Sequence, residues 1–260
     1  MGNSPVTRYL HDTWQFAGEL GRRPPLRRAA LVGRWTAAAA SERILDRHFA
    51  ARGLATSGRD PGHYGPSGLQ YGYVPTPWLA LLRMFPPGSL GADDAVLEYG
   101  CGKGRAVAFL SSRFPCRVTG VEIDPGLCAD AEANLAHVRQ RGRAEILRAD
   151  AAALEVPGDV TVAYLYNPFR GQVFGAVLDR LRESLERTPR PLRVVYYHPL
   201  MHDALIGAGF TPVRHEVNRS WGVREHPSGE PGPAWMPPYA WAEYRAGSYP
   251  GPQRDRPVRR

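Results

Sequence analysis

The sequence of 260 residues predicts an α/β fold with a doubly wound sheet of seven strands, mostly parallel, closed by a C-terminal antiparallel pair. Short apolar runs alternate with segments of helix length from residue 95 onward, as in parallel strands joined by helical crossovers. Residues 210–217 and 239–246 resemble strands with no helix predicted between them, and this predicts the antiparallel pair. A helical N-terminal extension is expected ahead of the sheet.

The first strand and helix surround a turn rich in glycine. Residues 95–100 (AVLEYG) form a short apolar strand, and the helix over 104–114 ends before Pro115. The other strands of the parallel part are expected at 117–123, 144–150, 160–166 and 192–198. Residues 160–166 are apolar on both faces, which is typical of a central strand covered by helices on both sides.

Three further helices are expected between these strands and after the last of them. Asp124 is a suitable N-cap and Pro125 a suitable first helical residue, and Gly142 is expected to end the helix that they begin. Residues 174–187 are amphipathic, and a shorter helix is expected around 202–209.

Composition divides the chain into three parts. Residues 1–68 are expected to form the helical extension and a linker, because 26–53 are rich in helix formers and are followed by a stretch dense in Gly, Pro and Ser. Residues 69–246 contain the whole strand and helix pattern and form the main domain. Residues 247–260 are a basic tail that we expect to be disordered.

The positive charge lies at the two ends of the chain. The formal net charge is +8, to which residues 1–53 contribute nine Arg against four acids and residues 247–260 four Arg against Asp255. The remaining residues therefore carry no net charge. Basic ends are typical of solubilising segments, although they can contact an anionic partner. A nucleic acid partner stays open but is not favoured.

The cysteines, the apolar runs and the histidines indicate the cellular setting and the absence of a predicted metal site. Cys101, Cys116 and Cys128 cannot all pair and form no CxxC motif, so a reduced, cytoplasmic protein is expected. No apolar run approaches the roughly 20 residues that a membrane span needs. His198 and His202 are four residues apart, but no third ligand is evident nearby, so no metal site is predicted.

The turn EYGCGKGR, residues 98–105, determines which ligand the fold is expected to bind. Glycine at a strand-to-helix turn lets the backbone approach a ligand closely. A phosphate-binding P-loop would need glycine in place of Glu98 and Ser or Thr after the Gly-Lys pair, so it is excluded. A dinucleotide fingerprint would need its third glycine where Arg105 stands. A nicotinamide-dependent oxidoreductase is therefore the disfavoured alternative.

With Glu98 ahead of Gly100, Gly102 and Gly104, the turn resembles the first motif of the class I, seven-strand S-adenosylmethionine-dependent methyltransferases, which have a Rossmann-like sheet. The resemblance extends over roughly residues 70–246. It implies that S-adenosylmethionine binds at the turn, near Glu98, and that the chain transfers a methyl group. The cationic sulfonium and ammonium of that cofactor suit an acidic turn.

The resemblance implies further cofactor contacts in sequence order. Glu122 lies twenty residues after Gly102, at the end of the second strand, and is expected to receive the ribose hydroxyls. Asp124 is also close, but N-capping accounts for it. Ile123 is expected to pack against the adenine ring. Asp150 follows the third strand and is expected near the adenine amino group, with a role as a turn cap as the alternative.

Residues after the fourth and fifth strands are candidates for the acceptor side. Asn167-Pro168-Phe169 is similar to the Asn-Pro-Pro-aromatic motif of methyltransferases that act on nitrogen, although one proline is missing and Asn-Pro is also a common turn. His198 is a candidate general base because imidazole titrates near neutral pH. Tyr73 and Thr76 lie in a GYVPTP segment, which resembles one that precedes the glycine motif in a group of bacterial proteins. The resemblance implies that they cover the methionine end of the cofactor, with a packed aromatic ring as the alternative for Tyr73.

The sequence thus predicts an S-adenosylmethionine-dependent methyltransferase with an unidentified acceptor, either a small molecule or a protein. Besides the oxidoreductase, one alternative is a catalytically silent module that keeps the fold. The oligomeric state and the acceptor atom are open.

Overall fold

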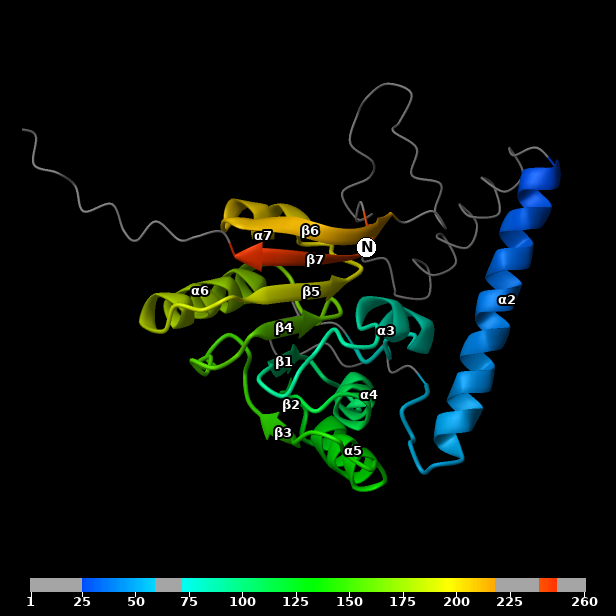
Figure 1. Cartoon of the computed structure of the whole chain (residues 1–260), viewed down its shortest axis with the longest axis horizontal. Coiled ribbons are helices and arrows are strands. Elements are labelled where there is room, and N and C mark those ends of the chain that lie inside the picture. Colours follow the sequence, from blue (N-terminus) through cyan, green and yellow to red (C-terminus); the bar gives the residue numbers. More distant parts are fainter. Residues whose placement is uncertain (1–24, 59–71, 218–238, 247–260) are drawn as a thin grey trace, which may run out of the picture.

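The computed structural model describes residues 25–58, 72–217 and 239–246. They form one seven-stranded sheet with the order β3-β2-β1-β4-β5-β7-β6, flanked by helices (Figure 1). The strands are β1 Ala95–Tyr99, β2 Arg117–Glu122, β3 Ala144–Arg148, β4 Val162–Leu165, β5 Arg193–Tyr197, β6 Phe210–Val217 and β7 Tyr239–Ala246. The helices are α2 Pro25–Ala50, α3 Trp78–Met84, α4 Arg105–Arg113, α5 Pro125–Ala136, α6 Gly171–Arg187 and α7 His202–Gly207.

Strand directions confirm the predicted fold class. Strands β1 to β5 pair in parallel, whereas β7 pairs antiparallel with both β5 and β6. The last strand in sequence therefore lies between β5 and β6 instead of at the sheet edge. The strand order reverses direction between β1 and β4, and ligands of open α/β sheets bind in the crevice at such a point, at the carboxyl ends of the strands.

Two apolar layers cover the two faces of the sheet. Alternate residues of a strand point to opposite faces, and in β1 Val96 belongs to one cluster of buried side chains while Leu97 belongs to the other. The first cluster includes residues of α3 and α4, and the second includes residues of α6 and α7. All five residues of β1 and all four of β4 are buried, as expected for central strands.

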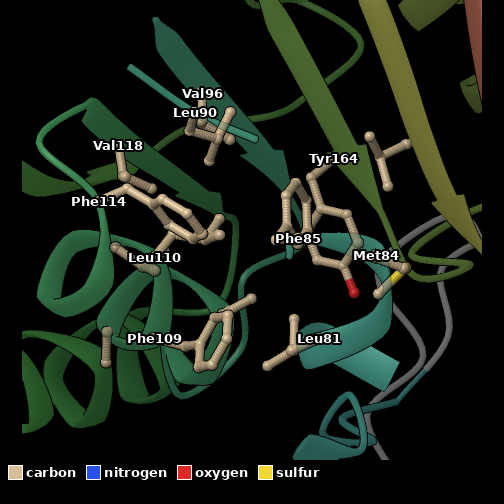
Figure 2. Packing of buried hydrophobic residues seen from close by; sticks show 14 of the residues in the cluster. Leu81, Met84, Phe85, Leu90, Val96, Phe109, Leu110, Phe114, Val118 and Tyr164 are labelled. Carbon is tan, nitrogen blue, oxygen red and sulfur yellow. The ribbon is translucent and has the colours of Figure 1, made fainter. Parts of the chain in front are cut away.

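Helix α3 brings the N-terminal part of the chain onto the sheet. Leu81 and Met84 are fully buried, and Phe85, directly after the helix, meets Tyr164 of β4 edge to face with 5.6 Å between the ring centroids (Figure 2). Figure 2 also shows Phe109 of α4 near Leu81. The segment before the glycine turn is therefore part of the main core.

One predicted helix end is wrong. Helix α5 ends at Ala136 and not near Gly142, because the backbone N–H of His137 turns back to the carbonyl of Asn134. The N–H of Gly142 instead donates to Ser111 O at 3.2 Å, and a Cβ at position 142 would overlap the carbonyl of Cys116. Glycine is needed there for close packing and not to end a helix.

Helix α2 confirms a helix in the N-terminal extension. It lies outside the layer formed by α3, α4 and α5 (Figure 1). The predicted tail at 247–260, most of the linker before residue 69 and the segment 218–238 lie outside the described residues. None of the helices in the described ranges combines the length and apolar character that crossing a membrane requires.

Candidate functional site

The glycine turn between β1 and α4 has a backbone that other residues would strain to adopt. Gly100, Gly102 and Gly104 have φ values of 69°, 54° and 73°, in the left-handed region that favours glycine. A Cβ at position 100 would overlap Pro168, and one at position 102 would overlap the ring of Tyr73. Both glycines are therefore needed for the close approach of two other segments to the turn.

Glu122 joins this turn to the end of β2. One carboxylate oxygen accepts a hydrogen bond from the N–H of Gly102 at 2.9 Å, and the other accepts from the N–H groups of Ile123 and Asp124 at 2.8 and 3.0 Å. The side chain is buried, yet it lines a cavity. A carboxylate offers about four lone-pair positions, so Glu122 can still accept from a ligand.

Glu98 is a buried carboxyl with a free oxygen. The residue is 5% exposed, and Oε2 has no hydrogen-bond partner among the described residues. Burial raises the pKa of Glu98 well above its usual value, with a smaller contribution from the negative charge of Glu122, and a backbone hydrogen bond from Val107 opposes the shift. An unpartnered buried carboxyl is unfavourable unless a ligand completes it.

A cavity of about 710 Å³ opens beside the glycine turn. This volume lies within the range of roughly 300–1,000 Å³ that is typical of small-molecule sites. All but one of the predicted site residues line the cavity; they are Tyr73, Thr76, Glu98, Gly100, Gly102, Glu122, Ile123, Asp150, Asn167 and His198.

Gly104 is the exception, and its contact with the cofactor stays a prediction. It does not line the cavity, and a Cβ added to it would lie 3.0 Å from Cβ of Ala131 in α5. Gly104 therefore lets the start of α4 pack closely against α5. Its amide takes part in the turn through a bond to Cys101 O at 2.9 Å.

Asp150 and Ile123 lie at the side of the cavity formed by the ends of β3 and β2. Asp150 is exposed and accepts a hydrogen bond from the N–H of Ala152 at 2.9 Å, so the turn-cap role is present. Ile123 is half-buried. Asp124 accepts from the N–H of Leu127 at 2.8 Å and caps α5, which confirms its predicted capping role.

Arg105 links the cavity wall to the N-terminal extension, and the sequence did not predict this link. The residue is 4% exposed. Its guanidinium donates to Asp46 at 2.9 Å, to both the side chain and the carbonyl of Thr56, and to the carbonyl of Thr76. It also lies 4.5 Å from the ring centre of Trp78. Burial lowers the pKa of Arg105, and the charge of Asp46 opposes that shift.

Helix α2 contacts the same region through two acids and an aromatic ring. The carboxylate of Glu42 accepts hydrogen bonds from the N–H groups of Trp78 and Leu79 at 2.8 and 2.7 Å. These N–H groups are at the start of α3, where a helix offers no acceptor of its own. Asp46 accepts from the indole N–H of Trp78, and Phe49 stacks on the indole at 3.9 Å. These contacts join α2 to the segment that leads from the cavity into α3.

Thr56 is the point where the extension meets the covering segment 72–76. Its carbonyl accepts from the hydroxyl of Tyr73 at 2.6 Å as well as from Arg105. The hydroxyl of Thr76 is 2.7 Å from that of Tyr164 in β4. The ring of Tyr73 is thereby held over Gly102, in the position that excludes a side chain there.

Asn167 and His198 lie at the carboxyl ends of the neighbouring strands β4 and β5, and their side chains are in contact. Asn167 Nδ2 is 2.5 Å from the carbonyl oxygen of His198 and 3.1 Å from its Nδ1. The hydroxyl of Tyr196 donates to Asn167 Oδ1 at 2.6 Å. Burial lowers the pKa of His198.

His198 and His202 do not share a helix, because His202 is the first residue of α7. Nδ1 of His202 lies 2.8 Å from the hydroxyl of Tyr244. The described residues contain no cluster of three potential metal ligands. Cys101 is buried and burial raises its pKa well above the usual value, so it is a packed thiol and not an activated one.

Comparison with known proteins identifies relatives of this domain. Residues 96–187 match the model of the family described as "Methyltransferase domain". The chain is 32% identical over 145 residues to the ribosomal protein L11 methyltransferase of Thermus thermophilus, a match covering 55% of this chain and 53% of that protein. The match therefore spans about half the length of that relative.

Two further proteins are similar to this chain. A protein-lysine N-methyltransferase of Saccharolobus islandicus is 28% identical over 127 residues, which cover 48% of this chain and 74% of the relative. Among solved structures, an RNA methyltransferase of Salinibacter ruber in complex with S-adenosyl-L-homocysteine matches with a TM-score of 0.42 and 22% identity. That match covers 66% of this chain and 92% of the other.

The contact between Tyr73 and Thr56 leads to a stability prediction. We expect Tyr73→Phe to lower the free energy of unfolding by about 1 kcal/mol, because the carbonyl of Thr56 loses a buried hydrogen bond. Tyr99→Phe is a matched control, since the Tyr99 hydroxyl is buried without a partner among the described residues and its removal is neutral or stabilising. Urea unfolding measures both. Equal losses in the two variants would contradict a specific contribution of the Tyr73 bond.

Proposed function

We propose that the protein is a class I S-adenosylmethionine-dependent methyltransferase that transfers a methyl group to a nitrogen acceptor. The match of residues 96–187 to the family model described as "Methyltransferase domain" supports this proposal. The observation that carries the proposal is the free carboxylate oxygen of Glu98, buried in the wall of a cavity beside the glycine turn. Such an atom suits a cationic ligand.

The charges of the cavity favour this cofactor over a dinucleotide. Glu98 and Glu122 both line it; an anionic pyrophosphate would be repelled by the carboxylate of Glu122 and would oppose ionisation of Glu98. Arg105 also lines the cavity, but its guanidinium already donates to Asp46, Thr56 and Thr76. The ammonium of S-adenosylmethionine would instead gain an ionic partner. The oxidoreductase alternative has no comparable support.

Each end of the cofactor has candidate partners in the cavity wall. We assign the amino group to Glu98, the ribose hydroxyls to Glu122, and the adenine to Ile123 and Asp150. Tyr73 and Thr76, which also line the cavity, would cover the methionine part. When bound, the cofactor supplies an electrophilic methyl carbon on positively charged sulfur, and the protein has to align an acceptor with it.

The acceptor side is formed by residues at the ends of β4 and β5. Asn167, Phe169 and Tyr166 line the cavity there, so an amide and two aromatic rings are available to orient a planar or amino group. The Asn-Pro-Phe sequence and the names of the two relatives, one acting on a ribosomal protein and one on protein lysine, support an amino nitrogen on a protein. A small-molecule amine is the other outcome that the experiment below distinguishes.

Domain boundaries and location are also part of the proposal. Residues 69–246 would form the cofactor-binding domain, with the extension at 1–68 contributing Asp46 and Thr56 to its support and 247–260 forming a basic tail. A cytoplasmic location is supported by Cys101, Cys116 and Cys128, all of which are free and buried.

The proposed activity is tested with the full chain, S-adenosylmethionine labelled in its methyl group, and a cell extract separated into protein, small-molecule and nucleic acid fractions. We expect label in the protein fraction, with stoichiometric S-adenosylhomocysteine. Label confined to small molecules would correct the acceptor class. Binding of S-adenosylhomocysteine without transfer to any fraction would contradict the activity and support a silent module.

Binding of S-adenosylhomocysteine is expected to release a proton. Burial raises the pKa of Glu98 in the free protein, and a cation placed beside Oε2 would lower it again. The affinity for S-adenosylhomocysteine should therefore increase as pH rises through the pKa of Glu98 in the free protein, and it should weaken below that pH. Calorimetric titrations in buffers of different ionisation enthalpy measure the released proton.

The control variants separate Glu98 from other carboxyls. Glu98→Gln keeps the shape of the side chain but has no proton to release. The dependence of the binding enthalpy on the buffer should therefore disappear. Glu145→Gln changes an exposed carboxylate of β3 and should leave it intact. Proton release that persists in Glu98→Gln would exclude Glu98 as its source.

A further inference from the structure

Asn167 and His198 share an unusual backbone geometry at the acceptor side of the cavity. Among the described residues they are the two non-glycine residues with positive φ, at 40° and 54°. Each lies two residues after one of a pair of neighbouring positions in the sheet, because Leu165 of β4 pairs with Tyr196 of β5. Strained backbone that is kept at a ligand cavity is a reason to look for a function.

Hydrogen bonds determine the orientation of the Asn167 side-chain amide. The carbonyl oxygen of His198 can only accept a hydrogen bond, so the nitrogen of the amide, and not its oxygen, must face it at 2.5 Å. Oδ1 then faces Tyr196, whose hydroxyl donates to it at 2.6 Å. The reversed amide would place two acceptor oxygens in contact.

This orientation also determines the tautomer of His198. The same Nδ2 of Asn167 lies 3.1 Å from Nδ1 of the imidazole. An amide nitrogen has hydrogens to donate and cannot accept, so Nδ1 must be the unprotonated nitrogen of the ring. A neutral imidazole then carries its proton on Nε2, the nitrogen on the other side of the ring. Burial lowers the pKa of His198, in agreement with a neutral ring.

We infer that His198 presents a fixed Nε2–H donor to the methyl acceptor and does not take a proton from it. A general base at Nε2 would need the ring proton on Nδ1, where it would meet the N–H of Asn167. No described residue bonds to Nε2, so the donor is available to a ligand in the cavity that His198 lines. The general-base role expected from the sequence is replaced by this one.

The Nε2–H donor of His198 limits the class of methyl acceptor, and this step rests on the proposed function. A substrate that binds here carries an oxygen or nitrogen lone pair beside the atom to be methylated, for example a carbonyl or carboxylate next to an amine. The nitrogen that is methylated must arrive with its own lone pair free, and the proton that it loses afterwards goes to water. A hydroxyl acceptor, which needs a base, is disfavoured.

The tautomer is tested without any substrate by ¹⁵N NMR of the full chain labelled in histidine. We expect the resonances of His198 to show a protonated Nε2 and an unprotonated Nδ1 between pH 6 and 8. Their absence in His198→Gln assigns them, and His202→Gln is the matched control that leaves them in place. A protonated Nδ1 in the unaltered protein would overturn the inference.

Activity provides the second arm once an acceptor is found. Glutamine at position 198 offers an amide N–H but no base, whereas alanine offers neither. We expect both variants to be slower than the unaltered protein and His198→Gln to be about 3- to 10-fold faster than His198→Ala, the effect of one hydrogen bond. Equal losses of about 100-fold or more in both variants would indicate a base and overturn the inference. If no acceptor is ever methylated, the proposed function fails, while the NMR result still decides the tautomer.

Discussion

The geometry of the site depends on the hydrogen bonds that the carboxylate of Glu122 accepts. This carboxylate accepts hydrogen bonds from three backbone N–H groups, one in the glycine turn after β1 and two directly after β2. The turn and the end of the neighbouring strand are therefore held at a fixed distance, although they are twenty residues apart in the chain. These bonds use both carboxylate oxygens and hold the side chain in one orientation. The wall beside the cavity is thus already in place before any ligand binds.

The other wall depends on a part of the chain that looks separate in the sequence. Arg105 follows the glycine turn directly. Its guanidinium donates hydrogen bonds to Asp46 in α2 and to Thr56, which follows α2 in the chain. Tyr73 bonds to the same carbonyl of Thr56 and covers Gly102. Arg105 is the buried partner of this ion pair, and loss of Asp46 would leave its charge without an ionic partner. The N-terminal extension therefore supports two residues of the cavity wall, Tyr73 and Arg105.

Local patterns predicted the elements, and contacts distant in sequence account for what was missed. The strands, the C-terminal antiparallel pair and the Asp124 cap follow from periodicity and residue type, whereas the site residues were predicted from the resemblance to class I methyltransferases. The close packing of Gly104 was missed because its neighbour, Ala131, is on another helix. The bond between Arg105 and Asp46 joins residues 59 positions apart, and that between Asn167 and His198 joins residues 31 apart. A local sequence pattern does not indicate pairs that are so far apart in the chain. Neither the support of the cavity wall nor the tautomer of His198 could therefore be predicted from the sequence.

The central claim is that the free oxygen of Glu98 receives the cationic end of S-adenosylmethionine or its product. A crystal structure of the full chain with S-adenosylhomocysteine tests it most directly. We predict the ligand in the cavity beside the glycine turn, with its amino nitrogen within hydrogen-bonding distance of Glu98 Oε2 and its ribose against Glu122. An empty cavity at saturating ligand, or a ligand whose amino group lies away from Glu98, would contradict the account.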